Sequence, residues 1–424
     1  MERTWLETQT RFFLTPIAGR FGGRREDNLR EDTVQLAEVL RPGLRGALFT
    51  TMKLDLTWLL EAFPFLTGVP CCFSMHDAHD HDVHPVAAQY PSLQVLRPTT
   101  ALAKHPYGTN HGKVMVLRYD RFVRLVVSSA NLIPEDYSQK TNSLWIQDCP
   151  TVRACPHPPA PATEEAQDFV AVLSDYLGAL FTPQQIGGVF REHSFDHIRA
   201  RLVSSVPGWH DDHSRYGSGR LQHLLTAVAV SPDAPLLLQA SSLGALGEWL
   251  RGFARSLGAD PDRAELQLVW PSADFVRRSN AGYMSGSALC ARRAAFSDRV
   301  RPMLCHYRSP DGRFRADAPP HIKTFLRYNP KDPRQVYWML SGSHNLSKAA
   351  WGQLVQPRGS PSKKLLIHSF EISVLLFPEA PSLQPPCRIP YLIPPPHYSP
   401  ADLPWVQDQA HLELDRFGQS WPGL

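Results

Sequence analysis

The stretch from His111 to Leu132 reads HGKVMVLRYDRFVRLVVSSANL and sets the pattern for the whole chain. Two apolar runs flank a short polar turn, which predicts a β-hairpin. The stretch from His321 to Leu346 repeats this plan as HIKTFLRYNPKDPRQVYWMLSGSHNL, with a longer turn. Both hairpins open on His-x-Lys and close on Ser-x-Asn-Leu, so we interpret them as two copies of one motif.

The segments that precede the two hairpins repeat as well. Each copy has an expected strand, then a segment with helical spacing of apolar residues, then a second expected strand. These are residues 46–50, 54–63 and 69–73 in the first copy, and residues 236–240, 241–253 and 266–270 in the second. A polar break at residues 208–220 lies near the middle of the chain. We therefore expect an α/β fold of two similar halves, residues 1–207 and 208–424. Each is expected to be a mixed sheet flanked by helices, with a pseudo-twofold axis between them.

Composition narrows the class of protein. The chain has 424 residues, 43% hydrophobic content and a net charge of +4, which excludes a disordered, collagen-like or coiled-coil protein. Its seven cysteines are odd in number and form no Cys-x-x-Cys pair, which argues against a zinc ribbon and a disulfide framework. The first residues are too charged for a signal peptide, and no run approaches the roughly 18 apolar residues of a membrane span. These features predict an unsecreted protein with reduced thiols and no membrane partner.

The residue types of the duplicated motif suit phosphoryl transfer. In a strand, residues i and i+2 point to the same face, so the His and Lys of each motif are expected to project together. The Asn that ends each return strand can join its pair. The six residues are His111, Lys113, Asn131, His321, Lys323 and Asn345.

Such a set can hold and cleave a phosphodiester. Ammonium and amide groups hold the phosphate oxygens, while one imidazole attacks phosphorus and the other protonates the leaving oxygen and activates water. The scheme requires neither metal nor cofactor, because the lysines supply the positive charge. The symmetry of the motifs leaves open which histidine attacks.

The paired His-x-Lys motifs resemble the phospholipase D superfamily, and Asn in place of its usual Asp resembles the tyrosyl-DNA phosphodiesterase 1 family. Further segments are similar to that family in the same order along the chain. They are RFFLTPIAG at 11–19, YGTNH at 107–111, SANLIPEDY at 129–137, QASSLGALG at 239–247, NLSKAAWG at 345–352 and SFEISVLLF at 369–377. The resemblance implies a phosphoric diester hydrolase that cleaves the 3′-phosphotyrosyl bond between DNA and a stalled topoisomerase I peptide, and other 3′ adducts.

The resemblance also implies roles for individual residues. His111 would be the nucleophile that forms a phosphohistidine, and His321 would act as acid and then as base. The two Lys and the two Asn would hold the phosphate. Glu371 would orient an active-site imidazole, although a Glu in an apolar strand also suits a simple ion pair with a neighbouring Lys. Four residues would contact the DNA: Tyr107, Ser242, Ser279 and Ser347.

The same resemblance implies a monomer that acts in DNA repair in the nucleus on DNA that is single-stranded near its 3′ end. No run of five or more Lys and Arg marks a nuclear signal. Three residues depart from the family, one of them Ala245, which replaces a small hydroxyl residue in the serine loop. Asn142 stands where its familiar members have Gln, and His344 adds a titratable group where Ala is usual.

Other interpretations stay open. A tract with four histidines, His76, His79, His81 and His84, could be a metal site, but its spacing gives no His-Glu-x-x-His pattern, so we interpret it as a variable polar loop. The alternative functions are another phosphodiesterase or nuclease of the superfamily, and a noncatalytic nucleic-acid-binding module.

Overall fold

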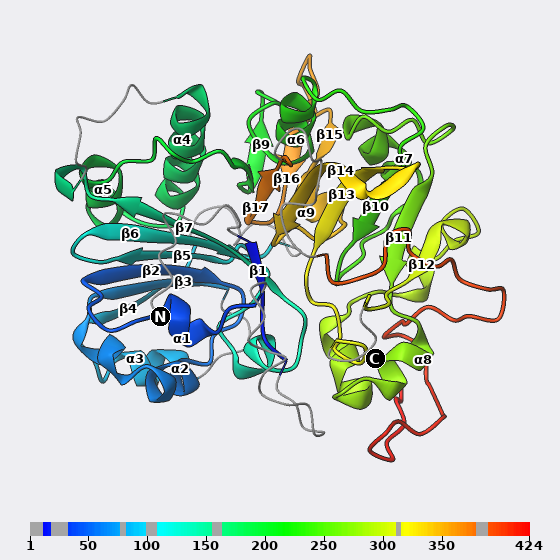
Figure 1. The fold of residues 1–424 in the computed structure, drawn as a ribbon, viewed down its shortest axis with the longest axis horizontal. Helices are drawn as coiled ribbons and strands as arrows, with labels where there is room; N and C mark the ends of the chain where they lie inside the picture. Colours follow the sequence, from blue (N-terminus) through cyan, green and yellow to red (C-terminus); the bar gives the residue numbers. More distant parts are fainter. Residues whose placement is uncertain are drawn as a thin grey trace.

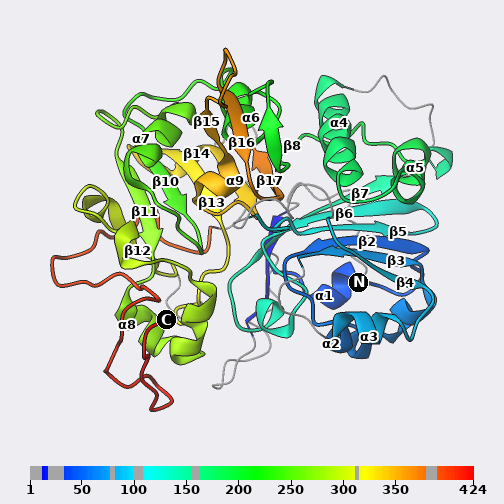
Figure 2. The same ribbon diagram turned by 180° about the vertical axis from the view of Figure 1, so that it is seen from behind.

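The computed structural model describes residues 12–17, 33–76, 82–98, 108–154, 163–310, 315–378 and 389–424. These residues build two seven-stranded sheets that lie side by side with helices packed around them (Figures 1 and 2). Among the described helices, none combines the length and the apolar character that a membrane crossing needs.

The first sheet has the strand order β1-β7-β6-β5-β2-β3-β4. Its strands are β1 (Phe12–Leu14), β2 (Gly46–Thr51), β3 (Cys71–Met75), β4 (Leu93–Leu96), β5 (Val114–Arg118), β6 (Phe122–Ser128) and β7 (Ser143–Pro150). Strands β2, β3 and β4 run parallel to one another, and the remaining neighbours pair antiparallel.

The second sheet has the order β12-β11-β10-β13-β14-β17-β8. Its strands are β8 (Arg201–Ser205), β10 (Leu236–Gln239), β11 (Leu266–Trp270), β12 (Leu304–His306), β13 (Thr324–Asn329), β14 (Asp332–Gly342) and β17 (Glu371–Leu376). Read from β4 to β1, the first sheet has the same plan, with parallel and antiparallel pairs at the same places. The expected duplication and the two mixed sheets are therefore confirmed.

Strand β8 pairs with β17 and so belongs to the second sheet. The expected boundary between residues 207 and 208 assigned this strand to the first half, whereas the structure places it in the sheet of the second half. Beyond the boundary, β9 (Gly208–His210) forms a small third sheet with β15 (Gln353–Val355) and β16 (Lys364–Ile367). The polar break at 208–220 therefore contains a short strand.

Helices cover the sheets on both sides. They are α1 (Leu36–Val39), α2 (Leu56–Ala62), α3 (Val83–Ala87), α4 (Glu164–Gly178), α5 (Pro183–Glu192), α6 (Gly217–Leu225), α7 (Gly247–Ser256), α8 (Ala273–Arg278) and α9 (Lys348–Trp351). Figures 1 and 2 show α1, α2 and α3 against one side of the first sheet, with α4 and α5 against its other side. One apolar core joins residues of both sheets with α4, including Val116, Leu326, Ile372 and Phe169. Burial of this core holds the two halves in a fixed relation.

The helix expected over residues 241–253 begins later, at Gly247. The residues before it form a loop, because the backbone N–H groups of Ser241 and Ser242 donate to the Asn345 side chain at 3.2 and 3.0 Å. In the first half, α2 starts close to its expected position because the Asp55 side chain accepts from the Trp58 N–H and caps the helix. In the second half, contact with the motif residue Asn345 therefore replaces the first turn of the expected helix.

A buried ion pair should contribute strongly to the stability of the first half. Arg124 on β6 is fully buried and binds both carboxylate oxygens of Asp148 on β7, at 2.7 and 2.8 Å. It also donates to the carbonyl groups of Glu38 and Val39 on α1. We predict that Arg124→Met, which leaves Asp148 buried and unpaired, lowers the free energy of unfolding by about 3–5 kcal/mol in urea titrations.

The matched control for this prediction is Arg45→Met. Arg45 pairs with Asp120, and both side chains of that pair are 64% exposed. Solvent screens such a pair, so its loss should move the urea midpoint little. Equal losses in the two variants would show that the buried pair has no special role.

Candidate active site

The two His-x-Lys segments lie just before β5 and β13, in extended chain rather than inside the strands. Each is hydrogen-bonded to the opposite half. The backbone N–H of His111 donates to the carbonyl of Phe370 at 3.0 Å, and the N–H of His321 donates to the carbonyl of Thr141 at 3.0 Å. The halves therefore exchange equivalent contacts, which is the pairing that a pseudo-twofold axis requires.

Each histidine ring is also oriented by a side chain from the opposite half. His111 Nδ1 lies 2.8 Å from Glu371 Oε2, and His321 Nδ1 lies 2.9 Å from Asn142 Oδ1. Donation of Nδ1–H to these oxygens leaves Nε2 of each neutral ring with its lone pair free. Glu371 thus contacts an active-site imidazole, and Asn142 fills the matching place for the other histidine.

Asn142 and Glu371 occupy corresponding positions in the two sheets. Trp145, three residues after Asn142, pairs with Val127 on β6, and Val374, three residues after Glu371, pairs with Ser341 on β14. The duplicated framework therefore supplies a carboxylate as the hydrogen-bond partner of one histidine Nδ1 and an uncharged amide as the partner of the other.

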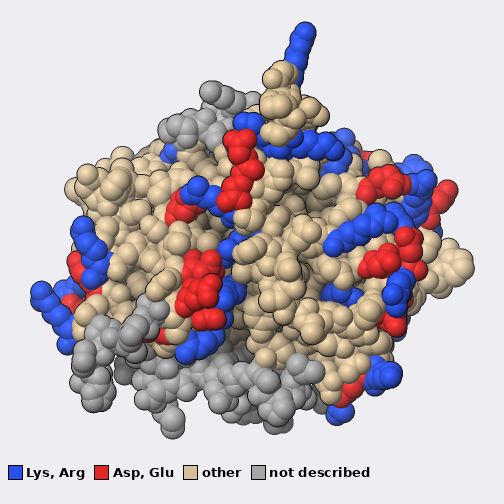
Figure 3. Space-filling view, turned by 90° about the horizontal axis from the view of Figure 1, so that it is seen from above, with Lys and Arg blue, Asp and Glu red and all other residues tan. Residues whose placement is uncertain are grey.

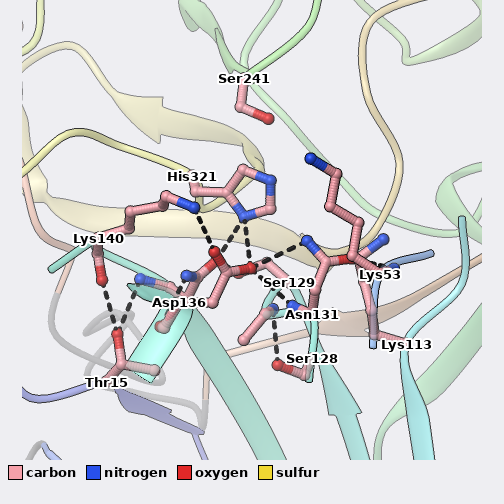
Figure 4. Close-up of polar contacts among 12 residues, drawn as sticks. Thr15, Lys53, Lys113, Ser128, Ser129, Asn131, Asp136, Lys140, Ser241 and His321 are labelled. Atoms are coloured by element: carbon pink, nitrogen blue, oxygen red, sulfur yellow. Dashed lines mark hydrogen bonds and ion pairs between the residues drawn. The ribbon is translucent and has the colours of Figure 1, made fainter. Parts of the chain in front are cut away.

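Asp136 is a central residue that the sequence did not single out. It is completely buried, and its Oδ2 accepts from the backbone and side-chain nitrogens of Asn131 at 2.7 and 3.0 Å. Its Oδ1 accepts from Lys140 Nζ at 2.6 Å, and Oδ2 lies 3.5 Å from His321 Nδ1 (Figure 4). Asp136 therefore fixes the first asparagine and contacts the second histidine. The only sign of Asp136 in the sequence is that this acidic residue lies inside the family-like segment SANLIPEDY.

The motif lysines are buried beside the histidines. Lys113 Nζ donates to the carbonyl of His111, and Lys323 Nζ donates to the carbonyl of His321 at 2.5 Å. Asn345 accepts from the loop after β10 through its Oδ1, as described above, so its amide nitrogen is directed elsewhere. The close approach of α4 explains the middle residue of the first motif, because a Cβ on Gly112 would lie 1.8 Å from Tyr176 Oη.

Burial shifts the protonation of the whole cluster. It lowers the pKa of His111 to about 4 and that of Lys113 to about 8. Burial and the positive charges of Lys323, Lys140 and Lys113 hold the pKa of His321 well below its usual value. Burial opposes ionisation of Glu371, but nearby His111, His344 and Lys113 keep its pKa below the ordinary value. Burial and the positive charge of Lys113 hold the pKa of Lys323 well below its ordinary value. The free site therefore has neutral imidazoles and lysines whose protonated form lacks counter-charge, so it favours an anion.

Of the four residues expected to contact the DNA, two lie near Asn345, one is buried and one lies outside the described residues. Tyr107 lies outside the described residues. Ser242 and Ser347 are partly exposed near Asn345, and the Ser347 side chain caps α9 by accepting from the Ala350 N–H. Ser279 is fully buried, and its hydroxyl lies within hydrogen-bonding distance of the Val276 and Gly282 carbonyls. The structure therefore does not bring Ser279 to the site surface.

His344 is next to Asn345 in the chain but does not face the phosphate site. Its ring is fully buried and stacks on Trp351 with centroids 4.2 Å apart. Nε2 lies 3.1 Å from Ser205 Oγ, and Nδ1 lies 2.8 Å from Ser373 Oγ. Because the Ser205 hydroxyl donates to the Ala350 carbonyl at 2.6 Å, it accepts from Nε2–H, and Nδ1 accepts from Ser373. His344 is a neutral histidine that links β14, β8 and β17.

Two pockets are lined by the loops that donate to the motif asparagines, at corresponding places in the two halves. The loop after β2 lines a pocket of about 390 Å³ together with His76, Asp82 and Glu135. The loop after β10, which includes Ser242, lines a pocket of about 360 Å³ with Cys290 and Gln407. Within the described ranges no group of three or more His, Cys, Asp or Glu side chains is arranged to hold a metal ion. Residues 77–81 of the histidine tract lie outside those ranges.

The positive charge of the site is internal. On the face seen from above in Figure 3, basic and acidic side chains of the described residues lie interspersed rather than gathered into one basic patch. Lys113 and Lys323 are nearly inaccessible, with 2% and 1% of their surface exposed. The lysines that could hold an anion therefore lie in the centre between the halves.

A duplicated α/β framework that brings His, Lys and Asn from each half to one centre is the arrangement expected of a phosphodiesterase, as the resemblance to the phospholipase D superfamily implied. The model of the tyrosyl-DNA phosphodiesterase family matches residues 11–399, and the chain belongs to this family.

Relatives and solved structures agree with this assignment. The chain is 29% identical to Arabidopsis thaliana tyrosyl-DNA phosphodiesterase 1, over 92% of this chain and 73% of that protein. It is also 29% identical to a probable tyrosyl-DNA phosphodiesterase of Caenorhabditis elegans, over 96% and 91% of the two chains. The crystal structure of the yeast tyrosyl-DNA phosphodiesterase has the same fold, with a TM-score of 0.70 and 17% identity over 94% of this chain and 99% of that chain.

His344 should make stability depend on pH. Burial lowers its pKa from 6.5 to about 4. At pH values between these two, the unfolded chain binds a proton that the folded protein does not, so stability falls as the pH falls. We predict that His344→Gln reduces the loss of unfolding free energy between pH 7 and pH 5 by about 2 kcal/mol, measured by urea titration.

The control replaces an exposed histidine on α6, His223→Gln. If both variants kept the full pH dependence of the intact protein, the buried neutral state of His344 would be refuted.

Proposed function

We propose that this protein hydrolyses the 3′-phosphotyrosyl bond between DNA and a topoisomerase I-derived peptide, and other 3′ adducts, through a phosphohistidine and without a metal ion. The observation that carries the proposal is the crossed arrangement at the centre, in which each half orients the histidine of the other. The names of the family and of its relatives support the choice of substrate.

The difference between Glu371 and Asn142 supports His111 as the nucleophile. In the first step His111 Nε2 forms a bond to phosphorus while the bond to the tyrosine oxygen breaks, and the imidazole becomes positively charged. The carboxylate of Glu371, 2.8 Å from Nδ1, stabilises that charge. The hydrogen-bond partner of His321 is the uncharged amide of Asn142, while the Asp136 carboxylate, 3.5 Å from Nδ1, is already engaged by Asn131 and Lys140, so His321 suits proton transfer to the leaving oxygen.

The low pKa of free His321 is compatible with a role as acid. After burial, the causes of the low pKa are the charges of Lys323, Lys140 and Lys113. A bound phosphodiester places a negative charge beside these lysines and offsets them, which favours the imidazolium form. In the second step neutral His321 takes a proton from water, the water oxygen attacks phosphorus, and the bond to His111 breaks, leaving a DNA 3′-phosphate.

The DNA and the peptide of the substrate are expected to occupy the two corresponding sides of the centre. We propose that the DNA strand, single-stranded near its 3′ end, lies on the side of Ser242 and Ser347, and that the peptide lies on the side of the loop after β2. Each side has a pocket next to the centre. The proposal includes action in DNA repair, as a monomer in the nucleus.

The test is cleavage of a single-stranded oligonucleotide that carries a 3′-phosphotyrosine, in the presence of EDTA. We predict release of a 3′-phosphate by the intact protein and a loss of about a thousandfold or more in His111→Ala and His321→Ala. A covalent DNA adduct that depends on His111 should accumulate when His321 is replaced. Binding without cleavage would favour a noncatalytic module, cleavage abolished by EDTA would overturn the metal-free scheme, and cleavage of a phospholipid alone would favour another superfamily activity.

A second prediction separates the two orienting residues. Glu371→Gln keeps the shape of the side chain but removes the charge, so formation of the phosphohistidine should slow on the order of a hundredfold in single-turnover assays. Asn142→Gln, which retains the amide, should remain far more active than Asn142→Ala. Full activity of Glu371→Gln would remove the basis for assigning His111 as the nucleophile.

A further inference from the structure

Lys53 occupies a special place in the duplicated framework. Thr50 pairs with the first residue of β5, and Gln239 pairs with the first residue of β13, so these two residues correspond. Three residues further along the chain, Lys53 corresponds to Ser242. The backbone N–H of Lys53 donates to Asn131 Oδ1 at 3.4 Å, as that of Ser242 donates to Asn345 Oδ1 at 3.0 Å.

The backbone of Lys53 is held on both sides, unlike that of an ordinary surface lysine. Its carbonyl accepts from the Thr51 hydroxyl at 2.7 Å and from the Leu132 N–H at 3.2 Å. Together with the contact to Asn131, these bonds fix the residue against the end of the first motif. The side chain therefore starts from a defined point at the edge of the catalytic centre, in the wall of the 390 Å³ pocket.

The Lys53 side chain extends toward the centre. Figure 4 shows it passing over the Asn131 amide, with its ammonium end directed toward His321 and Ser241. The charges of Lys53 and Lys323 both act on Cys290, whose N–H donates to the Ser241 carbonyl at 2.8 Å. Figure 4 thus places the ammonium group beside the proposed acid, His321, and its action on Cys290 shows that it also reaches toward the loop after β10. Within the described residues, no ion pair neutralises it.

We propose that Lys53 is a third cation of the active site, which stabilises the negative charge that develops on the departing oxygen. This inference rests on the proposed hydrolysis, in which the leaving oxygen lies beside His321. Lys113 and Lys323 are nearly fully buried and serve the phosphate oxygens, whereas exposed Lys53 can reach the leaving group. A fixed positive charge near that oxygen lowers the barrier most when the leaving group is a poor one.

The dependence of rate on the leaving group tests this role. The substrates are single-stranded oligonucleotides with 3′-phosphate esters of phenols of graded acidity, from phenol to p-nitrophenol, in single-turnover assays. In Lys53→Met the rate of bond cleavage should fall about tenfold more for the phenyl ester than for the p-nitrophenyl ester. Lys53→Arg retains the positive charge, so its rates for the two esters should lie close to those of the intact protein.

The control is Lys331→Met in the exposed turn between β13 and β14, which makes the same change in net charge away from the centre. It should leave the leaving-group dependence as in the intact protein. An equal loss for all esters in Lys53→Met, or no loss, would overturn the role of Lys53. Failure of the intact protein to cleave any ester would instead overturn the proposed function.

Discussion

The backbone hydrogen bonds that cross between the halves, among them those from His111 to Phe370 and from His321 to Thr141, are the constraint on which the site depends. They connect each histidine segment to the segment of the other half that carries the residue orienting that histidine. A small slide of one sheet against the other would break both bonds and move Glu371 and Asn142 away from the rings. The shared apolar core with α4 resists such a slide, so the packing of the interior also sets the geometry of the catalytic groups.

The electrostatics of the centre follow from the same burial. Among the described residues, the carboxylates that act on buried Lys113 and Lys323 are Asp136 and Glu371, and Lys140 adds a further positive charge beside them. Their mutual repulsion is a cost that the fold bears in the free state. A bound phosphate relieves it, so part of the affinity for an anion is already present in the structure of the unliganded protein.

The sequence predicted the parts of this arrangement that local patterns encode. The two hairpins, the His-x-Lys-Asn sets and the duplicated sheets could be read because strand periodicity and motif spacing are local. Contacts between the halves could not, because nothing in the sequence near Asp136 indicates that it lies against His321. The start of α7 was misplaced for a similar reason, since Asn345, far along the chain, captures the preceding loop. The resemblance identified Glu371, but it also suggested Ser279, whose hydroxyl is buried.

The unequal pair formed by Glu371 and Asn142 has a consequence for how such a centre can arise. In an assembly of two identical subunits, any substitution behind one histidine would appear behind the other as well. Both rings would then have the same basicity, and either could attack. Joining the two units in one chain removes that restriction, because each copy can mutate separately. In a single chain the two histidines can therefore differ, with one specialised for bond formation and the other for proton transfer.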